Sequence, residues 1–146
     1  MSSKAAEQLA KYQGWAALPL RAMLAASFIA HGRPKVYGSS ADAKFGAGVA
    51  DVAELLRAQG TPAPRLMAWV VTLVEYGGGF ALALGLCTRL VALLLAFTML
   101  VAIGQVKFRQ GFVGGYEYDL SLLAACLALA ISGGGPLSLD RALHLP

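Results

Sequence analysis

The sequence predicts an all-α integral membrane protein: an antiparallel bundle of four transmembrane helices, with an amphipathic interfacial helix between helices 1 and 2. Of its 146 residues, 58% are hydrophobic and only 14% are charged. The mean hydropathy of +0.63 lies well above the range of soluble domains. Four apolar stretches separated by mostly short connections are typical of a bundle. The expected spans, within one domain covering residues 1–146, are residues 15–31, 66–86, 90–106 and 116–132.

The first expected span begins at Trp15 and ends near His31, about 17 residues, which is close to the minimum for crossing a bilayer. Arg21 lies inside it. On an ideal helix Arg21 and His31 share one side. Gly32 and Pro34 are expected to end the helix, because proline lacks an amide donor and disfavours helix in the residue before it.

Between residues 36 and 64 the chain is expected to leave the hydrocarbon. Apolar residues recur there with helical spacing, at Phe45, Val49, Val52 and Leu56, opposite a charged face. Such a helix suits the membrane interface or the mouth of the bundle. An ordinary surface helix is an equally good interpretation.

The second expected span carries a carboxylate, Glu75, followed by three glycines. A carboxylate in the middle of a bilayer costs a few kcal/mol, so Glu75 is expected to face the bundle interior, a partner or a cavity. Gly77, Ala81 and Gly85 recur every four residues, a spacing that lets helices pack closely. The tight turn expected at residues 87–89 makes spans two and three antiparallel neighbours.

The fourth expected span must begin near Tyr116, because residues 120–132 alone would be only about 20 Å long. In a four-span chain the first and third connections lie on the same side of the membrane. Polar residues gather there and predict a funnel that ends at Glu75, with Arg21 as its ion-pair partner. A pair that only fixes helix register is the alternative. The candidate site residues are Arg21, His31, Lys35, Glu75, Tyr116 and Glu117.

The composition limits the metal and redox centres that this chain could hold. Two histidines, two cysteines and no CxxC pair disfavour a zinc, iron, haem or dithiol centre, so no metal is expected. Electron transfer would then need a bound diffusible carrier or a partner's cofactor. The net charge of +4 has no basic run with interleaved aromatics, so anionic lipid is a better expected partner than nucleic acid.

Three blocks of the sequence resemble members of the DoxX family of small membrane proteins. They are LRAMLAASFIAHGRPKVYG, EYGGGFALALGLCTRLVALLLAFTMLVA and GFVGGYEYDLSLLAACLALAISGGGPLSLD. The resemblance implies four membrane helices. It also implies a redox setting, since better-understood members are similar to subunits of quinone-linked oxidoreductases and of a complex for oxidative-stress defence.

The leading hypothesis is therefore a multi-pass subunit of a quinone- or quinol-linked oxidoreductase complex in the inner (cytoplasmic) membrane of a prokaryote. His31 and Glu75 would act at the quinone headgroup, with Glu117 passing protons toward the loops. Arg21 would orient Glu75, and Lys35 and Tyr116 would complete the binding site. The main alternative is a non-catalytic membrane anchor or assembly subunit, and a solute or proton pathway ranks last. Partner subunits are expected, and a homo-oligomer is left open.

Overall fold

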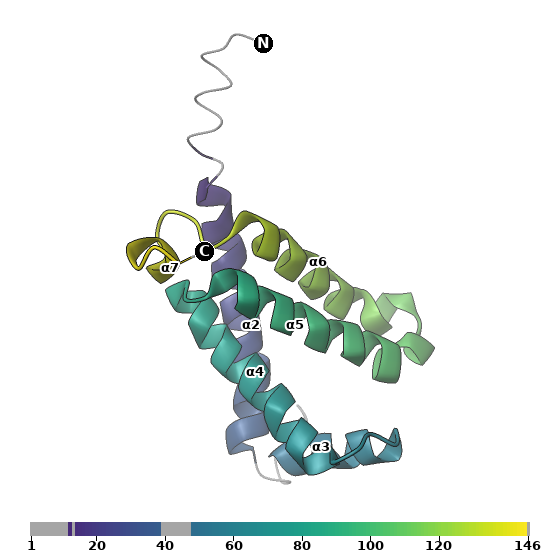
Figure 1. Cartoon of the computed structure of the whole chain (residues 1–146). Helices are drawn as coiled ribbons and strands as arrows, with labels where there is room; N and C mark the ends of the chain where they lie inside the picture. Colours follow the sequence, from purple (N-terminus) through teal and green to yellow (C-terminus); the bar gives the residue numbers. More distant parts are fainter. Residues whose placement is uncertain (1–11, 13, 39–47, 146) are drawn as a thin grey trace.

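The computed structural model describes residue 12, residues 14–38 and residues 48–145, and every regular element in this part of the chain is helical (Figure 1). The longer helices are α2 (Ala17–Tyr37), α3 (Gly48–Ala58), α4 (Pro64–Leu84), α5 (Thr88–Ala102) and α6 (Glu117–Ser132). The shorter segments are η1 (Gly14–Ala16), η2 (Ile103–Lys107), η3 (Phe108–Gln110), η4 (Phe112–Tyr116) and α7 (Leu139–Ala142). Helices α2 and α4 form one antiparallel pair, α5 and α6 form another, and the two pairs cross at an angle.

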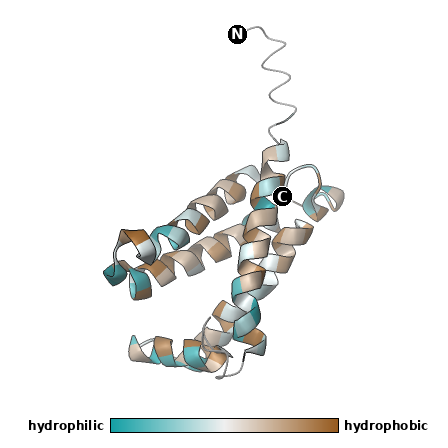
Figure 2. Cartoon of the chain, turned by 180° about the vertical axis from the view of Figure 1, so that it is seen from behind, coloured by the Kyte–Doolittle hydropathy of each residue, from teal (hydrophilic) through white to brown (hydrophobic). Residues whose placement is uncertain are grey.

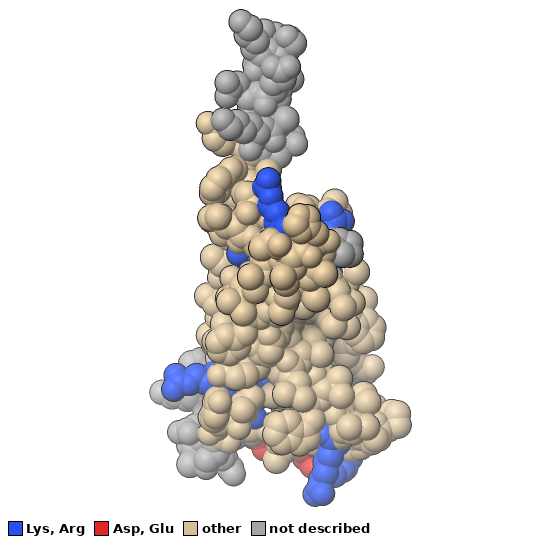
Figure 3. Space-filling view, turned by 60° about the vertical axis from the view of Figure 1, so that its left-hand side comes forward, with Lys and Arg blue, Asp and Glu red and all other residues tan. Residues whose placement is uncertain are grey.

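The molecule has two ends of different character. The turn end carries the α4–α5 turn, the beginning of α2 and the C-terminal segment that includes α7 (Figure 1). The loop end carries α3 and the connection between α5 and α6. On the face shown in Figure 3, lysine and arginine side chains gather at both ends with an uncharged band between them, and the visible carboxylates lie at the loop end. The hydropathy colours of Figure 2 follow the same division, as expected of a protein that crosses a membrane.

Among the residues that the structure describes, three helical stretches are long and apolar enough to span a bilayer: Pro64–Leu84, Thr88–Gln110 and Phe112–Ser132. Helix α2 is 21 residues long, like α4, but it is not one of these stretches. Its charged residues lower its hydropathy. Helices able to span a membrane are thus confirmed, whereas a fourth span, the four-helix bundle and a surface position for α3 stay predictions.

Helix α2 continues past the expected stop. Pro34 lies inside the helix, which ends at Tyr37, where the amide of Gly38 donates to the carbonyl of Pro34 at 2.7 Å. Glycine and proline inside a helix are intrinsically unfavourable by about 1 and 3 kcal/mol. Tertiary packing compensates, since a Cβ on Gly32 would lie only 2.8 Å from the Cβ of Tyr76 on α4. The expected end at Gly32 and Pro34 is therefore wrong.

The glycines of α4 allow two helices to approach it. A Cβ on Gly79 would lie 2.8 Å from Cγ1 of Ile29 on α2, and one on Gly78 would lie 3.3 Å from a methyl group of Leu95 on α5. Gly77 has no such neighbour within 4 Å. Gly78 and Gly79 therefore make the close helix contacts. Of the predicted stripe, Gly77 is exposed, whereas Gly85 is buried and a Cβ there would lie 2.6 Å from the Cβ of Ser138.

Of the apolar stripe predicted for α3, Val49, Val52 and Leu56 are partly buried. Ala53 is buried against the rest of the protein, and Asp51, Glu54 and Arg57 are exposed. The expected apolar residue Phe45 lies outside the described residues. Elsewhere the core is formed by apolar side chains of α2, α4, α5 and α6, the largest fully buried ones being Leu24, Phe28, Leu82, Leu95 and Leu129.

Candidate functional site

The carboxylate of Glu75 forms an ion pair with the ammonium group of Lys35, which joins α4 to α2 near the loop end. The side chain of Glu75 is 7% exposed and that of Lys35 is 23% exposed. Glu75 lies on the buried stripe of α4, with Thr72 one turn before it and Gly79 one turn after it. The extension of α2 past Pro34 presents Lys35 to this stripe. Ion pairing offsets much of the desolvation cost of the two charges.

His31 lies one turn before Lys35 on α2. Its Nδ1 is 2.8 Å from the carbonyl oxygen of Ser27. Because a carbonyl only accepts, Nδ1 must carry the hydrogen, and in the neutral ring Nε2 is left as an acceptor. The ring centroid lies 5.5 Å from that of Tyr118 on α6, with the planes tilted by 33°. His31 thus links α2 to α6 and presents a proton-accepting nitrogen.

His31 and Glu75 lie at about the same level of two antiparallel helices, because their neighbours Gly32 and Tyr76 are in contact. Thr72 is fully buried, and its hydroxyl has no hydrogen-bond partner among the residues described. Buried hydroxyl groups are normally hydrogen-bonded, so an unpartnered one is an available donor. The level of Glu75 therefore carries an ion-paired carboxylate and ammonium group, a fully buried hydroxyl and the exposed imidazole of His31.

A second buried ion pair lies at the loop end and was not predicted. Lys107 donates to Oδ2 of Asp119 at 2.6 Å, and the Asp119 side chain is 7% exposed. A signal for it is present in the sequence, because Asp119 shares helical spacing with the buried residues Leu122, Cys126 and Leu129 of α6. Asp119 adjoins Tyr118, the aromatic neighbour of His31.

Tyr116 and Glu117 make their contacts within the α5–α6 connection. The Tyr116 ring stacks on Phe108 with centroids 5.8 Å apart and meets the edge of Phe112 at 5.4 Å. Oε1 of Glu117 accepts from the amide of Gly114 at 3.0 Å, which closes the turn before α6. These two predicted site residues therefore lie at the loop end but in a neighbouring cluster.

Arg21 does not pair with Glu75, and that prediction is wrong. Its guanidinium group lies at the turn end and donates to the carbonyls of Gly134 at 2.5 Å, Leu137 at 2.7 Å and Ala83 at 3.4 Å. These are main-chain acceptors at the end of α4 and in the C-terminal segment. Ala83 lies eight residues beyond Glu75, roughly 12 Å along the helix. The buried Arg21 is thus satisfied by one carbonyl in the last turn of α4 and by two carbonyls outside the helices.

Asp140 completes the contacts that hold the C-terminal segment. Its two carboxylate oxygens accept from the amides of Cys87 at 2.5 Å and Thr88 at 2.8 Å, at the beginning of α5. Its own amide donates to the carbonyl of Gly85 at 2.9 Å. A carboxylate here caps the helix and complements its dipole. The segment after Gly133 is therefore an integral part of the turn end.

The arrangement at the level of Glu75 can donate and accept hydrogen bonds and exchange protons. In the part of the chain that the structure describes, no three His, Cys, Asp or Glu side chains come close enough to hold a metal ion.

Apolar helices of spanning length, with paired charges buried between them, define a small all-helical membrane protein. The chain belongs to the DoxX family, whose family model matches residues 16–108. It is 32% identical to "Putative oxidoreductase CatD" of Bacillus subtilis (strain 168) over 123 residues, which cover 84% of this chain and 83% of that protein. It is 36% identical to "Inner membrane protein YqjF" of Escherichia coli (strain K12) over 103 residues, 66% of this chain and 75% of that one. No solved structure matches.

Proposed function

We propose that this protein is an integral membrane subunit of a quinone- or quinol-linked oxidoreductase complex in the inner membrane of a prokaryote. In this proposal α2 is a fourth span and α3 lies at the membrane surface. The headgroup of the quinone binds at the level of Glu75. A relative bearing the word oxidoreductase in its name supports the redox setting.

The observation that carries the proposal is the buried Lys35–Glu75 pair at the level of an imidazole with a fixed tautomer. Charged residues within spanning segments are rare and usually mark a ligand or proton pathway. Quinones supply two-electron, two-proton chemistry, with carbonyl oxygens that accept hydrogen bonds and hydroxyl groups that donate them. The residues fit both forms: Lys35 and the unpartnered Thr72 hydroxyl donate, and Nε2 of His31 accepts.

In this assignment Nε2 of His31 takes a proton, because the hydrogen bond from Nδ1 to Ser27 leaves Nε2 as the acceptor of the ring. Glu75 holds a second proton-accepting position, and its carboxylate fixes the Lys35 ammonium group against the headgroup. Tyr116 and Glu117 lie between the site and the surface of the loop end, where protons pass to water. Arg21 has no part in the site, because it lies at the other end of α4.

The second candidate is a non-catalytic anchor or assembly subunit, and one observation favours it. Both buried carboxylates at the loop end, Glu75 and Asp119, are already closed into ion pairs. In an anchor, the whole role of such ion pairs would be to fix which helices pack together.

The test is quinone binding by the full-length protein purified in detergent with its co-purifying lipid. The organic extract is analysed for quinone, and binding of a short-chain ubiquinone and of a menaquinone analogue is titrated by calorimetry. Glu75→Gln and His31→Ala should each lose most of the bound quinone while the thermal unfolding midpoint shows a folded protein. Glu54→Gln is the matched control, since Glu54 is an exposed carboxylate at the same end. Equal binding by all variants, or a protein without quinone that retains a stoichiometric partner, would replace this proposal with the anchor.

A further inference from the structure

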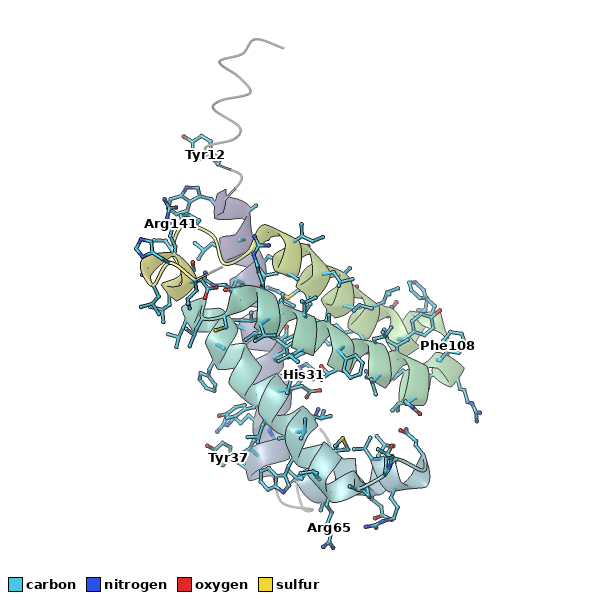
Figure 4. All side chains as sticks on the ribbon, in the orientation of Figure 1. Tyr12, His31, Tyr37, Arg65, Phe108 and Arg141 are labelled. Carbon is cyan, nitrogen blue, oxygen red and sulfur yellow. The ribbon has the colours of Figure 1, made fainter. Side chains whose placement is uncertain are left out.

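A depression of about 620 Å³ opens at the turn end, between the last turn of α4 and the C-terminal segment. Its volume lies within the range of small-molecule sites. Two arginines, Arg21 and Arg141, belong to its lining, together with Leu84 and Leu137. Figure 4 shows Arg141 at this end of the molecule, far from Arg65 and Tyr37 at the loop end. The depression is thus separate from the site at Glu75.

Two arginines bring positive charge to the lining of the depression, and the nearby carboxylate of Asp140 offsets part of it. The guanidinium group of Arg21 donates only to main-chain carbonyls in its described hydrogen bonds, so its charge has no carboxylate in direct contact. The nearby carboxylate of Asp140 is turned to the amides of Cys87 and Thr88. Arg141 is exposed, and no ion pair is formed by it among the described residues. An anion is the ligand that this charge favours.

The lining also has an apolar part at the boundary of the membrane. Leu84 is the last residue of α4, a helix whose 21 residues match the thickness of a bilayer core. Leu84 and Leu137 are 57% and 58% exposed. The exposed leucines therefore adjoin the arginines at the level where lipid headgroups would lie.

We propose that this depression binds the headgroup of an anionic phospholipid. The phosphate lies against Arg141 in the positive potential of Arg21, and the acyl chains lie on Leu84 and Leu137. A free anion would gain nothing from the two leucines, which is why the lipid is the preferred source of the phosphate. Because Arg21 also holds the C-terminal segment, bound lipid tightens the contact between that segment and α4.

The test is native mass spectrometry of the full-length protein in detergent with equal amounts of phosphatidylglycerol and phosphatidylcholine. The wild type should retain phosphatidylglycerol preferentially, and Arg141→Ala should reduce that preference about tenfold, as expected for the loss of one charge-assisted hydrogen bond. Arg141→Lys should keep much of it. Arg109→Ala, which removes an exposed arginine from the loop end, should leave it unchanged.

Thermal unfolding with added inorganic phosphate distinguishes the two sources of the anion. Phosphatidylglycerol should raise the unfolding midpoint of the wild type and not that of Arg141→Ala, and inorganic phosphate should raise neither. Equal loss of lipid preference in Arg141→Ala and Arg109→Ala would show attraction by overall charge and overturn the site. Stabilisation by phosphate alone would overturn the lipid as its ligand.

Discussion

Replacing Gly79 by alanine tests whether close packing of α2 on α4 supports the Lys35–Glu75 pair. A Cβ at Gly79 would lie 2.8 Å from Cγ1 of Ile29 and 3.0 Å from its backbone nitrogen, so the helices would have to move apart. The same substitution at Gly77 meets no such atom within 4 Å. Both variants gain about 1 kcal/mol of intrinsic helix preference. The difference between them therefore isolates the overpacking cost, which is about 1–3 kcal/mol.

The assay is reversible unfolding in mixed micelles, followed by circular dichroism as the denaturing detergent fraction rises. Gly77→Ala should be at least as stable as the wild type. Gly79→Ala should be less stable than Gly77→Ala by about 1–3 kcal/mol, a factor of roughly five to more than one hundred in the unfolding equilibrium constant. Equal stability of the two variants would refute the contact of Gly79 with α2 and, with it, the structural basis of the loop-end pair.

Two further predictions concern the charged residues. Lys35→Met should destabilise the protein by up to about 3–5 kcal/mol, because it leaves Glu75 buried and unpaired. The double variant Lys35→Met/Glu75→Gln should recover most of that loss. Detergent unfolding measures both variants, and no recovery in the double variant would show that Lys35 acts through packing alone. Asp140→Ala should lower the free energy of unfolding by about 1–2 kcal/mol, because it removes the cap of α5, and should speed hydrogen exchange of the Cys87 and Thr88 amides. Unchanged exchange at both amides would contradict the cap.

Some of the loop-end site could be predicted from local rules. The burial of Glu75 follows from the cost of a carboxylate in hydrocarbon, and its position on the core face follows from helical spacing. The same spacing places Asp119 on the core face of α6, but the expected span was defined by length and not by its buried face. The membrane class follows from composition alone, which depends on no contact between helices.

The ion-pair partners could not be predicted, because they depend on the relative position of helices that are distant in the sequence. Arg21 and Lys35 were both available to Glu75. The contact of Gly32 with Tyr76 and the continuation of α2 through Pro34 bring Lys35 to it, while Arg21 lies beside the carbonyl of Ala83. A proline rule describes one residue and its neighbours, whereas packing against α4 acts on the whole helix.

The sequence by itself determined a helical membrane protein with a carboxylate that must be neutralised, since hydropathy and the cost of burying charge are properties of each segment. The tertiary structure alone decided which cation neutralises it and what the C-terminal segment does. Those outcomes depend on where Gly79 lets α2 approach and on which carbonyls are left free at the end of α4. No single segment contains that information, because each contact joins residues from two helices or from a helix and the chain's end.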